Sequence, residues 1–195
     1  MSAPNTPRTF LEASSEGLHP RHHRWHHAAA YAAWAHRHQI RKDGKTPYFA
    51  HTARVTLIIS ALFGCNDPDT LAAALLHDTI EDTTTDFDTL DDLFGTTVAT
   101  MVAALTKNMS MPETTREPEY DARIATADWR VRLIKLADAY DNLSDSASDP
   151  GRDKNLPKRL EAARRALHLA KPDLAHHAET RTAVDLLTQL INRNT

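Results

Sequence analysis

Residues 71–82 read LAAALLHDTIED, a run of small and branched apolar side chains that ends in an imidazole and three carboxylates. Leu71 and Leu75 are four residues apart and Asp78 follows Leu75 by three, which is the spacing of one face of an α-helix. The Asp-Pro pair just before the run supplies a capping side chain and a proline at the first helical position. We therefore expect a buried helix over 67–78 with Asp78 directed toward the core.

The rest of the chain shows the same helical spacing between proline and glycine stops, without alternating β-branched runs. Helices are expected over 22–39, 46–62, 67–78, 86–94, 97–106, 118–127, 130–146, 158–170 and 173–192. A polar loop is expected over 107–117. Residues 1–20 are rich in Pro, Ser and Thr and are expected to form a mobile arm. The prediction is an all-α fold, a single compact helical bundle over residues 21–195.

The charge and composition of the chain argue against several kinds of binding partner and cellular location. The formal net charge of -3 and the pI near 6.4 argue against a duplex nucleic-acid partner, because such binders carry a basic face. No apolar stretch reaches the roughly 18–20 residues that cross a membrane, and no secretory signal is visible. The single cysteine, Cys65, forms no internal disulfide, which favours a reducing compartment. We expect a cytoplasmic protein that acts on a small molecule.

Two further polar side chains fall on apolar helix faces. His51 precedes Val55 and Ile58 by four and seven residues, so its imidazole should point inward. Asp138 follows Val131 and Ile134 by seven and four residues, which places its carboxylate on a buried stripe as well. Buried imidazoles and carboxylates are costly unless they are paired or bind a metal ion.

Together, His51, His77, Asp78 and Asp138 suggest one divalent cation whose charge the two carboxylates would cancel. Mixed nitrogen and oxygen ligands without a thiolate suit Mn²⁺ or Fe²⁺ better than structural Zn²⁺. For any one of the four, a hydrogen-bonded core residue is the commoner explanation. Four such residues on apolar faces shift the balance toward a metal.

Several nearby polar residues are candidates for chemistry or substrate binding. Glu81 and Asp82 follow the His-Asp pair closely enough to orient and deprotonate a water, although a solvated acidic helix end is the alternative. Arg41 and Lys42 form a basic pair in a loop, suited to phosphates or to stacking on a base, although an exposed charged turn is commoner. Asn142 lies one turn after Asp138 and could bond a sugar hydroxyl; the alternative is a polar residue at a bundle edge.

In these segments the chain resembles the HD-domain superfamily, and within it the hydrolase domain of the RelA/SpoT-type alarmone enzymes, most closely the stand-alone small alarmone hydrolases. The matching segments are Arg41-Lys42-Asp43-Gly44, Thr46-Pro47-Tyr48 with His51, Ala74-Leu75-Leu76-His77-Asp78, Glu81-Asp82-Thr83, Leu105-Thr106-Lys107, Lys135-Leu136-Ala137-Asp138 and Asn142-Leu143. The resemblance covers about residues 25–170, and the combination of motifs in this order is highly specific.

The resemblance implies a site and a reaction. It implies Mn²⁺ held by His51, His77, Asp78 and Asp138, with Glu81 and Asp82 acting on the attacking water. It also implies that Arg41 and Lys42 border the nucleotide, that Asn142 contacts the ribose and that Lys107 reaches a phosphate. The implied enzyme is a guanosine-3′,5′-bis(diphosphate) 3′-pyrophosphohydrolase, which converts ppGpp or pppGpp to GDP or GTP plus pyrophosphate.

Two departures from the family pattern leave alternatives open. Asp141 stands where many relatives carry a bulky or aromatic residue, which bears on the base-side pocket. The segment Pro118 to Arg130 is short and mixed in charge, so its phosphate contacts are unassigned. One alternative is a phosphohydrolase acting on ppApp, pppApp or another nucleotide phosphate. Another is a non-catalytic alarmone-binding protein, although all six metal and catalytic candidates are present. Homo-oligomer formation is left open.

Overall fold

The computed structural model describes residues 20–147 and 154–195. Within these ranges the chain forms helices and no strand, and the one β-bridge joins Ile40 to Pro47. The all-α prediction is confirmed. The mobile arm predicted over 1–20 falls, apart from Pro20, outside the described residues. No helix in the described part of the chain combines the length and apolar character needed to span a membrane.

The chain divides into two compact units, and each unit is made of two separate stretches of the sequence. In the described residues, the first unit contains 20–53 and 67–106, and the second contains 54–66, 107–147 and 154–195. The elements of the first unit are α2 (Pro20–Ala35), the start of α3 (Phe49–Leu57), α4 (Pro68–Leu76), α5 (Thr79–Asp82), α6 (Phe87–Phe94) and α7 (Thr96–Leu105). Those of the second are the rest of α3, the π-helical turn η1 (Ile58–Leu62), α8 (Glu113–Thr126), α9 (Trp129–Ala147), α10 (Leu156–Leu169), the 3₁₀-helix η2 (Lys171–Ala175) and α11 (Ala178–Arg193).

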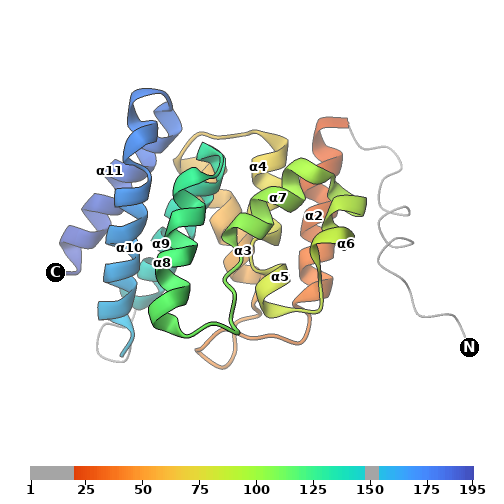
Figure 1. Ribbon diagram of the computed structural model, residues 1–195, viewed down its shortest axis with the longest axis horizontal. Helices are drawn as coiled ribbons and strands as arrows, with labels where there is room; N and C mark the ends of the chain where they lie inside the picture. The colour runs from red at the N-terminus through yellow and green to blue at the C-terminus, as the bar shows by residue number, and fades with distance from the viewer. Residues whose placement is uncertain (1–19, 148–153) are drawn as a thin grey trace, which may run out of the picture. The chain divides into compact units, whose positions relative to one another are not determined.

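Helix α4 is the centre of the first unit. It packs against α2 and α7 (Figure 1). All of its residues from Thr70 to Leu76 are buried. As expected, the Asp67 carboxylate caps the helix by accepting a 2.9 Å hydrogen bond from the Thr70 amide, and Pro68 occupies the first turn. Because the residues from Leu71 to Leu76 are all apolar, this part of α4 can be buried on every side, and each buried leucine contributes roughly 1.5–3 kcal/mol.

The loop between α2 and α3 differs from the sequence prediction. The expected helix start at 46–47 is wrong, because Pro47 pairs with Ile40 in the β-bridge and α3 begins only at Phe49. The Asp43 side chain holds the turn by accepting 2.9 Å bonds from the amides of Lys45 and Thr46. A polar turn therefore replaces the first turn of the helix and presents Arg41 and Lys42.

In the second unit, α9 packs against α10 and α11 (Figure 1). A buried ion pair joins α9 to the segment before α11, with Arg132 Nε 2.6 Å and Nη2 2.8 Å from the Asp173 carboxylate. Arg132 Nη1 also donates to the carbonyls of Ile124, Ala125 and Ala127 at the end of α8. One guanidinium thus satisfies carbonyls that the helix end leaves without intrahelical partners.

Helix α8 begins at Glu113, five residues before the predicted start, so the expected loop over 107–117 is shorter. Pro118, interpreted from sequence as a helix start, lies inside α8. Pro118 lies in the second turn of α8, so it removes the hydrogen bond that its N–H would otherwise donate to the carbonyl of Thr114.

Candidate active site

His77 and Asp78 lie at a break between two helices. His77 is the C-cap of α4 and Asp78 is the N-cap of α5, so the expectation that both sit within one helix is wrong. His77 Nδ1 donates a 2.8 Å hydrogen bond to the carbonyl of Ala74, which fixes the tautomer and leaves a lone pair on Nε2. Nε2 lies 3.1 Å from Asp78 Oδ2. The break therefore brings the imidazole and the carboxylate of adjacent residues together.

His51 joins this pair within the first unit. Its side chain is 1 % exposed, and the centres of the His51 and His77 rings are 5.2 Å apart. His51 Nε2 lies 3.6 Å from the same Asp78 oxygen. Three of the four predicted metal ligands are thus neighbours. Nitrogen lone pairs this close to a carboxylate oxygen favour a proton or a cation among them, which fits a divalent metal.

Tyr48 orients Asp78, a role that the sequence did not reveal. Its hydroxyl donates a 2.6 Å hydrogen bond to Asp78 Oδ2. Its ring stacks on His36, with ring centres 4.8 Å apart and planes 28° apart. Burial, followed by the charge of Asp78, raises the pKa of the Tyr48 phenol well above its ordinary value. The phenol therefore keeps its proton and remains a hydrogen-bond donor to Asp78.

Buried His36 and half-buried Gln39 form a second connection, also missed from sequence. His36 Nδ1 and Gln39 Oε1 are 2.6 Å apart, and Gln39 Nε2 donates to the backbone carbonyl of Asp82. Burial lowers the pKa of His36 below its ordinary value, against the hydrogen bond to Gln39. His36 follows buried Ala32 by four residues, so the helical spacing that singled out His51 could have found it.

Glu81 and Asp82 lie in α5, directly after the His-Asp pair. Partial burial, followed by the nearby charge of Asp78, raises the pKa of Asp82 above its ordinary value. A carboxylate with a raised pKa is a better proton acceptor near neutral pH, which is the property that a general base needs.

Asp138 lies on α9 in the second unit and is 9 % exposed. Lys135 Nζ donates to its Oδ2 at 2.7 Å, and Asn142 Nδ2 donates to its Oδ1 at 2.5 Å. The structure therefore places Asn142 on the same face as Asp138, as the helical spacing predicted. Lys135, which the sequence did not single out, contacts the carboxylate directly.

Three cationic residues that were predicted to contact the substrate have different surroundings in the structure. Arg41 lies over the Tyr48 ring, 5.7 Å from its centre, whereas Lys42 is exposed. Lys107 Nζ binds both carboxylate oxygens of Glu117, at 2.8 and 2.9 Å. Arg41 is thus next to the residue that orients Asp78.

Asp141, which departs from the family pattern, lies in a buried ion pair. It is 3 % exposed, and Arg54 holds it through Nε at 2.6 Å and Nη2 at 2.9 Å. The same guanidinium contacts Asp145 at 3.0 Å. The carboxylate of Asp141 is therefore neutralised by an ion pair between α3 and α9.

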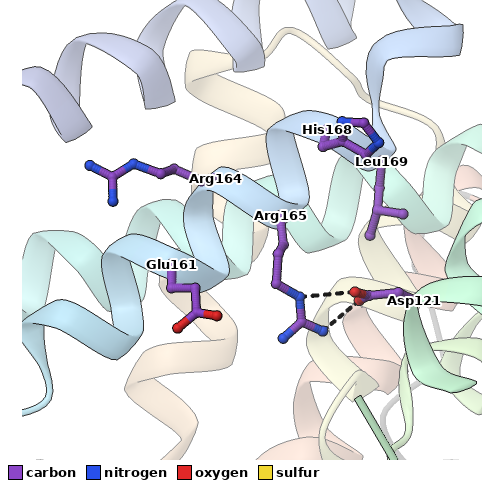
Figure 2. Close-up of a pocket in the computed structure, with 6 residues that line it drawn as sticks. All are labelled: Asp121, Glu161, Arg164, Arg165, His168 and Leu169. Carbon is purple, nitrogen blue, oxygen red and sulfur yellow. Dashed lines mark hydrogen bonds and ion pairs between the residues drawn. The ribbon is translucent and has the colours of Figure 1, made fainter. Parts of the chain in front are cut away.

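A surface hollow in the second unit has none of the predicted site residues in its lining. It is lined by Asp121, Glu161, Arg164, Arg165, His168 and Leu169 (Figure 2). Arg165 points to Asp121 and makes two hydrogen bonds with its carboxylate, at 2.9 and 2.6 Å. This hollow contains none of the candidate ligands or catalytic carboxylates.

The sequence matches a known protein family. The family profile described as HD domain matches residues 28–169. The chain belongs to the HD-domain family. Its buried His51, His77 and Asp138 are of the metal-ligating types, and they make this HD-domain protein a candidate metal binder.

Individual relatives carry a specific activity in their names. The HD-domain chain is 40% identical over 116 residues to the guanosine-3′,5′-bis(diphosphate) 3′-pyrophosphohydrolase MESH1 of Danio rerio, covering 59% of this chain and 64% of that protein. It is 39% identical over 119 residues to the Homo sapiens protein of that name, covering 60% and 66%. It therefore spans just under two thirds of the length of these curated relatives. A solved structure of a metazoan SpoT orthologue that hydrolyses ppGpp matches with a TM-score of 0.73 and 28% identity, over 90% of this chain and 97% of that one.

Proposed function

We propose that this HD-domain protein is a metal-dependent guanosine-3′,5′-bis(diphosphate) 3′-pyrophosphohydrolase, which converts ppGpp or pppGpp to GDP or GTP plus pyrophosphate. The observation that carries the proposal is the group of His51, His77 and Asp78, buried or half-buried, in a chain similar to hydrolases of that name. The short α5 adds two carboxylates, Glu81 and Asp82, beside this group.

We infer that His51, His77, Asp78 and Asp138 hold one Mn²⁺. Imidazole nitrogens with carboxylate oxygens and no thiolate suit this metal. When bound, such a cation lowers the pKa of water and neutralises charge on phosphate. Tyr48 keeps Asp78 oriented through its 2.6 Å hydrogen bond, and the Ala74 carbonyl keeps Nε2 of His77 available as the ligand atom.

The reaction adds one water across one phosphoester bond. The water oxygen bonds to the phosphorus that is attached to ribose O3′, the bond from that phosphorus to O3′ breaks, and O3′ gains a proton. Glu81 and Asp82 orient the water and accept its proton. The raised pKa of Asp82 suits this role, and the bond from Gln39 to the Asp82 carbonyl supports the position of α5.

We propose the substrate contacts that the family resemblance implies. Arg41 and Lys42 border the nucleotide from the loop before α3, Lys107 reaches a phosphate, and Asn142 bonds the ribose. The planar guanidinium of Arg41 already lies over the Tyr48 ring. Such a group can stack on a base or bind a phosphate through two hydrogen bonds.

We also propose that residues 21–195 act as one HD-type domain in the cytoplasm. The family match over 28–169 includes segments of both compact units, so neither unit alone corresponds to the HD domain. The buried thiol of Cys65, the single cysteine of the sequence, is compatible with a reducing compartment.

Turnover of ppGpp, ppApp and deoxynucleoside triphosphates, measured side by side with Mn²⁺, tests the function. We expect GDP and intact pyrophosphate from ppGpp. Orthophosphate released stepwise would contradict the pyrophosphohydrolase assignment. Faster turnover of ppApp would transfer the assignment to an adenosine alarmone, and binding of ppGpp without turnover would make the chain an alarmone-binding protein.

A further inference from the structure

Two lysines meet at one buried ring in the second unit. Tyr120, on α8, is 3 % exposed. Lys107 Nζ lies 5.0 Å from the centre of its ring, and Lys135 Nζ, from α9, lies 5.6 Å from it. An ammonium group at this distance from a tyrosine ring is attracted by the negative charge of its face. The lysine pair, Lys107 and Lys135, is thus gathered around Tyr120 from two segments of the chain.

Lys135 also occupies one oxygen of a predicted metal ligand. Its Nζ donates to Oδ2 of Asp138 at 2.7 Å, whereas Asn142 donates to Oδ1. The side chains of Lys135 and Asp138 are 19 % and 13 % exposed, so water screens their charges only in part. A divalent cation held by the Asp138 carboxylate would repel the ammonium of Lys135 from it. Asn142 is uncharged and can keep its bond to Oδ1.

Lys107 retains positive charge although it is hydrogen-bonded. Its partner, Glu117, also accepts from Arg165 Nη1 at 3.0 Å and from Arg116 Nε at 3.5 Å. Arg165 is also paired with Asp121, so two carboxylates are shared among three cations and cancel only part of their charge. The lysine pair therefore gains net positive charge whenever Asp138 is committed to a metal ion.

We propose that Lys135 is a phosphate-binding residue that shares Asp138 with the metal ion. When the cation binds Asp138, Lys135 gives up its bond to Oδ2, stays against the face of Tyr120 and donates to a phosphate oxygen of the substrate together with Lys107. Lys135 thereby adds a phosphate contact that the sequence did not assign, beside the one expected of Lys107. This inference rests on the proposed function, because it takes Asp138 as a metal ligand and a pyrophosphate group as the anion.

The first test measures Mn²⁺ binding to the full chain without nucleotide, by calorimetry. Lys135→Met removes the ammonium and keeps most of the methylene stem against Tyr120. We expect it to bind Mn²⁺ about 3- to 10-fold more tightly than the wild type, because a partly buried competing ion pair is removed. Lys107→Met is the matched control, since Lys107 contacts Glu117 instead of Asp138, and its Mn²⁺ affinity should equal that of the wild type. Unchanged or weaker Mn²⁺ binding by Lys135→Met overturns the proposal.

The second test titrates inorganic pyrophosphate, as its Mn²⁺ complex, into the Mn²⁺-loaded proteins. Loss of one charge-assisted hydrogen bond should weaken binding by roughly 10- to 100-fold in both Lys135→Met and Lys107→Met. Wild-type pyrophosphate affinity in Lys135→Met overturns its role toward phosphate. If Lys135→Met fails to fold, Lys135→Arg decides: it keeps the charge, so it should retain pyrophosphate binding within a few-fold of the wild type, and its loss counts against the proposal.

Neither readout requires turnover. A protein that does not hydrolyse ppGpp, yet shows tighter Mn²⁺ and weaker pyrophosphate binding in Lys135→Met, would disprove the proposed reaction and support the role of Lys135. A protein that hydrolyses ppGpp with neither change would do the reverse.

Discussion

The phenol of Tyr48 donates a 2.6 Å hydrogen bond to Oδ2 of Asp78, the oxygen that also lies 3.1 Å from Nε2 of His77. Thirty residues separate the donor from the acceptor in the sequence. The contact orients the carboxylate toward the two imidazoles, and it links the loop that carries Arg41 to the helix break that carries the candidate ligands.

Tyr48→Phe tests this contact. Partners of metal ligands typically change metal affinity by about 10- to 100-fold, so the variant should bind Mn²⁺ more weakly by that factor. Tyr31→Phe is the control, because the Tyr31 hydroxyl contacts Thr85 at 3.1 Å. Calorimetry with Mn²⁺ alone measures both. Equal Mn²⁺ affinity in Tyr48→Phe and wild type would show that the hydrogen bond is only structural.

Asp138→Ala should abolish Mn²⁺ binding, because it removes one of two anionic ligands of the proposed site. Metal present at 100 times its dissociation constant adds about 2.7 kcal/mol to the free energy of unfolding. Mn²⁺ should therefore raise the melting temperature of the wild type and leave that of Asp138→Ala unchanged, and a chelator should reverse the rise. A metal-dependent increase that persists in Asp138→Ala would remove Asp138 from the ligand set.

Glu81→Gln separates chemistry from binding. If Glu81 positions and deprotonates water, the variant should retain Mn²⁺ and nucleotide while kcat falls by about 10²- to 10⁴-fold with little change in KM. His51→Ala should instead lose metal and activity together, with partial rescue at high Mn²⁺. Wild-type kcat in Glu81→Gln, or loss of its Mn²⁺, would mean that this carboxylate has another role.

The pair of Arg54 and Asp141 should stabilise the fold. Arg54→Met leaves the buried Asp141 carboxylate without its guanidinium partner, which should lower the free energy of unfolding by about 1–3 kcal/mol. Arg54→Met combined with Asp141→Leu should recover part of this loss, because no buried charge then remains. Urea unfolding of both single variants and the double variant gives the coupling. Strictly additive effects would show that the pair contributes no coupling.

His36 should make stability depend on pH. Its folded-state pKa lies below the ordinary value of about 6.5, so protonation favours the unfolded chain. Above about pH 6.5 the neutral imidazole of His36 makes its full contribution to the free energy of unfolding. This contribution is lost as the pH falls from about 6.5 toward the lower pKa of the folded state, by at most about 1.4 kcal/mol per pH unit. The groups that act on His36 are Gln39, Asp78, Asp82 and His77. His36→Gln should show a shallower fall in unfolding free energy between pH 7 and 5 than the wild type, and an identical slope would contradict the assignment.

Periodicity along single helices was enough to predict much of this protein. It predicted the all-α class, the start of α4 at its Asp-Pro cap, and the inward direction of His51 and Asp138, which are both buried. These properties depend on the local sequence. An apolar stripe shows which face of a helix is buried, and a capping residue followed by proline shows where the helix can begin. Local signals failed at the starts of two helices. Pro47 was drawn into a bridge with Ile40, and α8 began five residues before Pro118.

Only the tertiary structure decided which buried side chains meet. Tyr48 with Asp78, Gln39 with the Asp82 carbonyl, and Arg54 with Asp141 are separated by 30, 43 and 87 residues. Lys135 and Lys107 meet at Tyr120 in the same way, from two segments around one ring. A helical pattern specifies the direction of a side chain relative to its own axis, but a hydrogen bond or ion pair forms only when packing brings two axes to within a few ångströms of the required separation.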